Sequence, residues 1–121
     1  MKDRKLIIAF DFDGTVVQNQ WPDIGEPFPG TIDILRNWQY RFNLILWTCR
    51  INEYLDMAIE FLHCNGITNF VVNRNVENLG FETSNKIFAD VYIDDRAMIP
   101  DWSSIDAKLT EMQKQIEELR K

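Results

Sequence analysis

Phe10-Asp11-Phe12-Asp13-Gly14-Thr15-Val16 follows directly on an apolar run at residues 6–9, which is typical of a buried strand. Asp11 and Asp13 are therefore expected where a strand ends, and alternation along a strand places residues i and i+2 on one face. Gly14 permits a turn immediately afterwards. Ligands of open α/β sheets bind outside the carboxyl ends of the strands. The stretch thus predicts a site for a divalent cation and for nucleophilic or acid–base chemistry.

The length and composition of the chain fit one folded domain. It has 121 residues, 45% of them hydrophobic, and we expect a single domain over residues 1–121. The formal net charge of −6 offers no general attraction to a phosphate backbone, which argues against a nucleic-acid partner. No run approaches the ~20 apolar residues of a membrane span. Cys49 and Cys64 have neither zinc spacing nor a disulfide framework, which suits the reducing cytoplasm. From these two observations together we expect a cytoplasmic protein without membrane contact.

The hydrophobic pattern predicts an α/β fold with a mainly parallel sheet flanked by helices. Apolar runs predict strands at residues 6–11, 43–48, 70–72 and 91–93. Helical spacing predicts helices at residues 31–40, 51–65 and 105–120, with a loop at 98–102 and an irregular segment at 73–85.

Residues 14–29 contain three prolines and two glycines, which exclude a long helix. We expect a loop or a small hairpin that folds back over the end of the first strand. One interpretation is a plain surface connection. The other is a short flap over the site, which would bring Trp21, Ile24 and Glu26 near a substrate.

The last predicted helix has apolar residues at alternating spacings of four and three: Ile105, Leu109, Met112, Ile116 and Leu119. This narrow stripe could serve a coiled coil and hence a homo-oligomer. A terminal helix that packs the stripe on the sheet is the interpretation that we favour.

Two further predicted strands end in residues suited to phosphate chemistry. Thr48, at the end of the second strand, can donate its hydroxyl to a phosphoryl oxygen, or it can cap the next helix. Arg50 can donate to a phosphate through two hydrogen bonds. Asp94 and Asp95 follow the fourth strand, and adjacent acids repel unless a cation joins them. The alternative for this pair is a turn in which Asp95 pairs with Arg96.

Taken in order, DFDGTVV, Thr48, Lys86 and Asp94-Asp95 resemble the four motifs of the haloacid-dehalogenase-like phosphohydrolase superfamily. No segment between these motifs is long enough for a cap domain, so the chain resembles a small capless member. The resemblance implies a Rossmann-like domain. It also implies Mg²⁺, held by Asp11, Asp94 and Asp95 and by Asp13, whose backbone carbonyl would help to bind the metal.

The resemblance further implies roles for single residues. Asp11 would attack phosphorus and form an aspartyl-phosphate, while Asp13 would protonate the leaving oxygen and then activate water. Thr48, Arg50 and Lys86 would stabilise charge on the phosphoryl oxygens. We expect the substrate to contact Arg50, Gly14 and Glu26.

The expected function is the Mg²⁺-dependent hydrolysis of a small phosphorylated metabolite. One alternative is a phosphatase for nucleic-acid 3′ ends, which an open site and Arg50 permit and the net charge opposes. Another is a non-catalytic receiver-like domain that accepts a phosphoryl group. Receivers place their adjacent acids after the first strand and the phosphorylated Asp after the third. Here the acidic pair follows the fourth predicted strand, and Val72 runs into Asn73.

Overall fold

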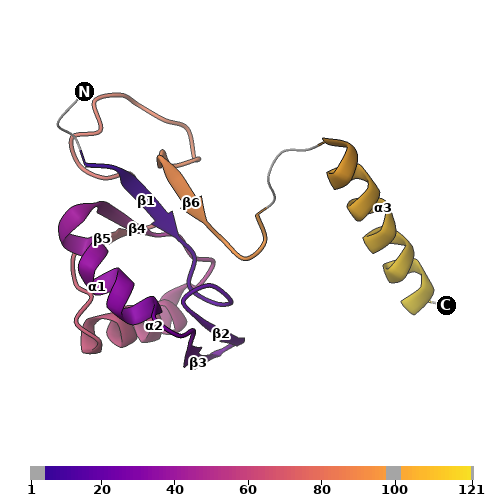
Figure 1. Cartoon of the computed structure of the whole chain (residues 1–121), viewed down its shortest axis with the longest axis horizontal. Helices are drawn as coiled ribbons and strands as arrows, with labels where there is room; N and C mark the ends of the chain where they lie inside the picture. Colours follow the sequence, from indigo (N-terminus) through magenta and orange to yellow (C-terminus); the bar gives the residue numbers. More distant parts are fainter. Residues whose placement is uncertain (1–4, 98–101, 121) are drawn as a thin grey trace.

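The computed structural model describes residues 5–97 and 102–120 and has the α/β architecture that the sequence predicts (Figure 1). In chain order the elements are β1 (Ile7–Phe10), β2 (Val17–Gln20), β3 (Asp23–Pro27), α1 (Thr31–Arg41), β4 (Asn43–Leu46), α2 (Asn52–Cys64), β5 (Phe70–Val72), β6 (Val91–Ile93) and α3 (Trp102–Leu119). The predicted strands and helices are all present, with ends that differ by up to three residues. Most of the loop predicted at residues 98–102 lies outside the described residues.

The main sheet has four parallel strands in the order β5-β4-β1-β6. The two central strands, β1 and β4, are apolar and almost entirely buried, as is usual for strands that are covered on both faces. Hydrogen bonds extend the ladders beyond the carboxyl ends. The N–H of Asp11 donates to Ile93 O (2.9 Å), and that of Asn73 donates to Leu46 O (2.9 Å). The carboxyl ends of β1, β4, β5 and β6 therefore lie together at one end of the sheet.

Two different layers cover the sheet. On one face, Leu44 and Leu46 pack with Leu35 of α1 and with Ala58 and Leu62 of α2. The opposite face packs under residues 73–90, which contain neither helix nor strand, as predicted for residues 73–85. This asymmetry leaves the acidic residues at the carboxyl edge between a helical layer and an irregular one.

Residues 14–29 form a hairpin in which β2 and β3 pair in antiparallel fashion. The hairpin begins in a tight turn, because the N–H groups of Val16 and Val17 both donate to Phe12 O. Phe12, Val16 and Val17 are buried, so this turn anchors the hairpin to the core. The prediction of a loop or small hairpin is confirmed in its hairpin form.

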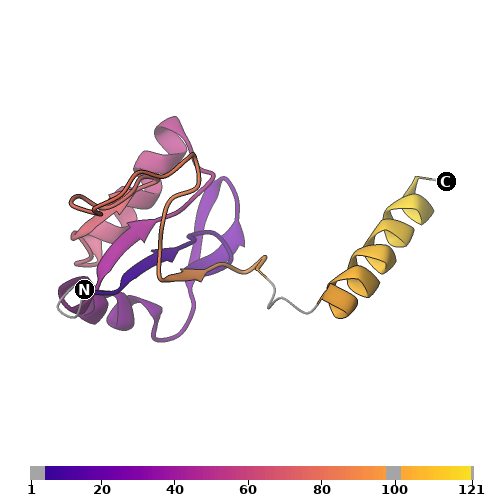
Figure 2. The ribbon, with the colours of Figure 1, turned by 90° about the horizontal axis from the view of Figure 1, so that it is seen from above.

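Helix α3 lies apart from the sheet (Figures 1 and 2). Leu109, Met112, Ile116 and Leu119 are all exposed, whereas the side chain of Ile105 is outside the described part of the structure. The expectation that this helix packs its stripe on the sheet is therefore wrong. Periodicity places apolar residues on one face of a helix, but it does not specify what covers that face. No helix in the described part of the chain is long and apolar enough to cross a membrane.

Candidate functional site

A cavity of about 310 Å³ lies at the carboxyl edge of the sheet. Its lining comes from the segments that follow β1, β4, β5 and β6: Asp11, Trp47, Thr48, Cys49, Asn73 and Asp94. The fold thus brings together three residues singled out from the sequence, Asp11, Thr48 and Asp94. Cys49 is exposed beside this cavity.

An acidic cluster of Asp11, Asp94 and Asp95 lies at this edge. One carboxylate oxygen from each residue is within 4.8 Å of the other two. Thr15 connects the two sides of the cluster: its hydroxyl donates to Asp11 Oδ2 (3.2 Å) and accepts from the N–H of Asp95 (3.1 Å). Sequence analysis assigned no role to Thr15. Its position in the turn after Asp13 was the signal that could have identified it.

The electrostatics of the cluster favour a cation. Burial raises the pKa of Asp11 to about 6, and the negative charges of Asp94 and Asp95 act in the same direction. Hydrogen bonds from the backbone of Phe12 and from Thr15 lower it by less. A divalent cation would relieve this repulsion, and carboxylate oxygens are the ligands that Mg²⁺ and Ca²⁺ prefer. The donor set therefore fits a divalent cation such as Mg²⁺ or Ca²⁺.

Gly14 shapes the cluster through the space that it leaves. Its φ is +83°, and a Cβ at this position would lie 2.3 Å from Asp95 Oδ2. Any larger residue would displace that carboxylate. Gly14 was expected to contact substrate, but in the structure it lies against Asp95 and is not part of the cavity lining.

Asp13 lies outside the acidic cluster. Strand β1 ends at Phe10 and the chain turns at once, so the alternation that would place Asp11 and Asp13 on one face does not continue. The Asp13 carboxylate instead accepts two hydrogen bonds from Arg50, from Nε (2.7 Å) and from the second guanidinium nitrogen (2.8 Å). Its side chain is not among the three carboxylates that could share a metal ion.

Arg50 is fully enclosed, with 1% of its surface exposed. Besides the two bonds to Asp13, its guanidinium donates to three backbone carbonyls, those of Pro22, Asp23 and Tyr54. The group also lies over the rings of Phe12 and Trp21, 5.5 and 5.0 Å from their centroids. All of its N–H donors are used within the chain. The prediction that Arg50 binds a substrate phosphate is therefore wrong.

Thr48 is held in place by Asn73. The Thr48 N–H donates to Asn73 Oδ1 (2.8 Å), and Asn73 Nδ2 donates to Thr48 O (2.9 Å). The Thr48 hydroxyl accepts from the N–H of Arg50 (3.2 Å) and lies beside the cavity. Sequence analysis gave Asn73 no functional role, although its place directly after β5 marks it as a residue at the carboxyl edge.

The remaining predicted residues are not brought to the cavity. Lys86 is exposed, and its amino group lies 5.6 Å from the centroid of the Tyr92 ring. Among the residues that the structure describes, it makes no ion pair with the acidic cluster. Glu26 is exposed on β3 and does not line the cavity. The ring of Trp21 packs against that of Tyr54 (5.1 Å between centroids), and Trp21 does not line the cavity.

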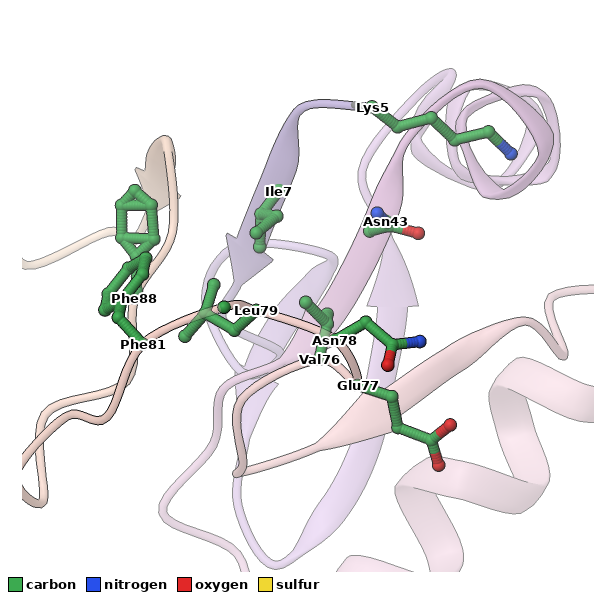
Figure 3. A pocket seen from close by; sticks show the side chains of 10 residues that line it. Lys5, Ile7, Asn43, Val76, Glu77, Asn78, Leu79, Phe81 and Phe88 are labelled. Atoms are coloured by element: carbon green, nitrogen blue, oxygen red, sulfur yellow. The ribbon is translucent and has the colours of Figure 1, made fainter. Parts of the chain in front are cut away.

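A second cavity, of about 390 Å³, lies at the opposite end of the sheet, where strands β1 and β4 begin (Figure 3). Apolar residues such as Leu79, Phe81 and Phe88 form much of its wall. The amino group of Lys5 points toward α1, where it donates to Tyr40 O (3.2 Å). This cavity has no acidic cluster in its lining, so the cavity beside Asp11 is the better candidate for chemistry.

Comparisons with known proteins agree with this fold. No protein-family model and no curated protein matches the chain. A solved structure, described as that of a conserved protein coded by a locus of Bacteroides thetaiotaomicron, superposes with a TM-score of 0.70. The two sequences are 38% identical, and the match covers 90% of this chain and 93% of the other.

Proposed function

This chain belongs to the same family as the conserved Bacteroides thetaiotaomicron protein, and we propose that it is a Mg²⁺-dependent phosphatase for a small phosphate monoester. The observation that carries the proposal is the convergence of Asp11, Asp94 and Asp95 beside a cavity at the carboxyl edge of a parallel sheet. The motif order that resembles the haloacid-dehalogenase-like phosphohydrolases supports it.

Asp11 is the proposed nucleophile. Its carboxylate lines the cavity and is oriented by the hydroxyl of Thr15. Attack on phosphorus forms an aspartyl-phosphate and breaks the bond to the leaving oxygen; water then hydrolyses the aspartyl-phosphate and restores Asp11. Asp94 and Asp95, together with Asp11, would hold Mg²⁺. When bound, the metal would supply the positive charge that allows an anionic phosphate to approach a carboxylate.

Asp13 and Thr48 are the proposed partners of Asp11. From the resemblance alone, Asp13 stays the proposed group that gives a proton to the leaving oxygen and later accepts one from the attacking water; its side chain does not line the cavity, and both of its carboxylate oxygens accept hydrogen bonds from Arg50. Arg50 fixes the direction of the Asp13 carboxylate through two hydrogen bonds. The Thr48 hydroxyl would donate to a phosphoryl oxygen, with its backbone locked by Asn73. Lys86 stays a proposed charge donor, from the resemblance alone.

The decisive experiment measures phosphate release from phosphorylated sugars, nucleotides, amino acids and 3′-phosphorylated oligonucleotides, with Mg²⁺ and with EDTA. We expect Mg²⁺-dependent turnover by the wild type and none by Asp11→Asn. Asp56→Asn is the matched control, because Asp56 is exposed on α2 and outside the cavity. Equal turnover by the wild type and Asp11→Asn would remove Asp11 as the nucleophile, and no release from any class would overturn the proposed activity.

The two alternatives are weaker. A phosphatase for nucleic-acid 3′ ends relied on Arg50, whose donors are all used within the chain. A receiver-like domain would keep a phosphoryl group on an aspartate without turnover. Incubation with acetyl phosphate separates the two classes, because a receiver accumulates a stable phosphoprotein, whereas the proposed phosphatase releases phosphate continuously.

A further inference from the structure

An apolar groove lies between α1 and the edge strand β6. It has a volume of about 170 Å³ and an almost wholly apolar lining that includes Val16, Ile34, Trp38 and Ile93. Ile34 is 48% exposed, and Val91, on the same side of β6 as Ile93, is 44% exposed. On the helical face of the sheet, α1 and α2 thus cover the central strands and leave β6 open. We call this hollow the β6 groove.

Helix α3 carries a matching apolar surface, which we call the α3 stripe: Leu109, Met112, Ile116 and Leu119. All four side chains are exposed, Leu119 to 86%. Burying a side chain of this size removes its apolar surface from water, which is favourable. Four such residues on one face of a helix therefore provide a strong driving force for contact with another apolar surface.

We propose that the β6 groove of each protomer receives the α3 stripe of a second copy, so that two chains exchange their last helices. In the structure α3 does not lie over its own groove but stands apart from the sheet (Figures 1 and 2). Such an exchange is symmetric, and the same contact forms twice. The proposal is independent of the proposed catalytic activity.

The length of α3 and the number of contacts that an exchange creates favour this occupant. With 18 residues, α3 is about 27 Å long, which exceeds the roughly 16 Å of the 11-residue α1 that walls the groove. Exchange creates two helix-in-groove contacts and covers both grooves. Pairing of two α3 helices alone creates one contact and leaves both grooves open.

The test is the solution mass of the full chain by light scattering. We expect twice the 14.3 kDa of one chain for the wild type. Met112→Asp in the stripe and Ile34→Asp in the groove should each give monomers. Lys114→Asp, on the opposite side of α3, should stay dimeric. Circular dichroism checks the fold of each variant, and Ile34 is exposed enough for its replacement to be tolerated. A monomeric wild type would overturn the proposal.

Two further outcomes would also overturn it. A dimer that survives Ile34→Asp but not Met112→Asp would show that α3 helices pair with each other. To separate exchange from closure within one chain, the exposed Cys49 and Cys64 are first replaced by Ser. Ile34→Cys is then combined with Leu109→Cys, Met112→Cys or Ile116→Cys and oxidised. We expect disulfide-linked dimers, and a disulfide formed only within single chains would contradict the exchange.

Discussion

The carboxylate of Asp13 accepts two hydrogen bonds, of 2.7 and 2.8 Å, from the guanidinium of Arg50, a residue 37 positions further along the chain. The same guanidinium donates to the carbonyls of Pro22 and Asp23 at the tip of the hairpin. One enclosed cation therefore joins the turn after β1, the β2–β3 hairpin and the start of α2. The geometry of Asp13 depends on that junction.

Arg50→Lys tests this junction. A lysine keeps the charge but cannot reproduce the planar set of donors, so carbonyls at the hairpin tip lose their partners. We expect about 3 kcal/mol less stability in urea unfolding and, for an active enzyme, a lower kcat with little change in KM. Arg36→Lys is the control, since Arg36 is half exposed and its ion pair with Asp33 is worth less than about 1 kcal/mol. Similar losses in both variants would contradict the special role of Arg50.

The raised pKa of Asp11 predicts that the metal-free protein loses folding stability as the pH rises. Its pKa is 3.8 ordinarily and about 6 in the fold. Between these values the folded state keeps a proton that the unfolded state has lost, so the stability from this group is complete below pH 3.8 and is lost as the pH rises through 6. With EDTA at pH 7.5, Asp11→Asn should therefore be more stable than the wild type, by on the order of 1–2 kcal/mol after solvent screening.

This gain should shrink as the pH is lowered toward 4, which chemical unfolding at a series of pH values would show. Asp56→Asn, which removes an exposed carboxylate on α2, should not show the same pattern. A gain for Asp11→Asn that is constant over the whole range would mean that the charge of Asp11 is not its source.

Metal binding predicts a thermal shift. Mg²⁺ that binds only the folded state raises Tm by linkage. The double replacement Asp94→Asn with Asp95→Asn removes two of the three clustered carboxylates and should abolish the shift. Asp56→Asn should retain it. If the double variant shifts as much as the wild type, the cation binds elsewhere.

Gly14→Ala tests the close approach between Gly14 and Asp95. The matched control is Gly80→Ala, because Gly80 also has a positive φ of +91° but has no atom within 4 Å of an added Cβ. The control should cost about 1–2 kcal/mol for the left-handed backbone alone. Gly14→Ala should cost more and should also weaken Mg²⁺ binding in a calorimetric titration, since the methyl group displaces Asp95. If Gly14→Ala and Gly80→Ala change the stability and the Mg²⁺ affinity by the same amounts, the Asp95 carboxylate moves aside without cost.

The sequence by itself determined the α/β class, the order of the elements and the meeting of Asp11, Thr48 and Asp94 at one edge of the sheet. These features follow from local patterns. Apolar runs and helical spacing define strands and helices, and parallel strands necessarily bring their carboxyl ends to the same edge.

Only the tertiary structure decided which polar groups make all of their hydrogen bonds within the chain. By its residue type and its position after β4, Arg50 is a candidate phosphate ligand. In the fold, its guanidinium is instead enclosed by backbone carbonyls of the hairpin and of α2. No spacing rule in the sequence connects those carbonyls with Arg50. Asn73 and Thr15 acquire their roles from contacts with Thr48 and Asp11. The α3 stripe is visible in the sequence, but what covers it is not. Hydrogen-bond partners and apolar contacts depend on distances between segments remote in the chain, and local periodicity carries no information about those distances.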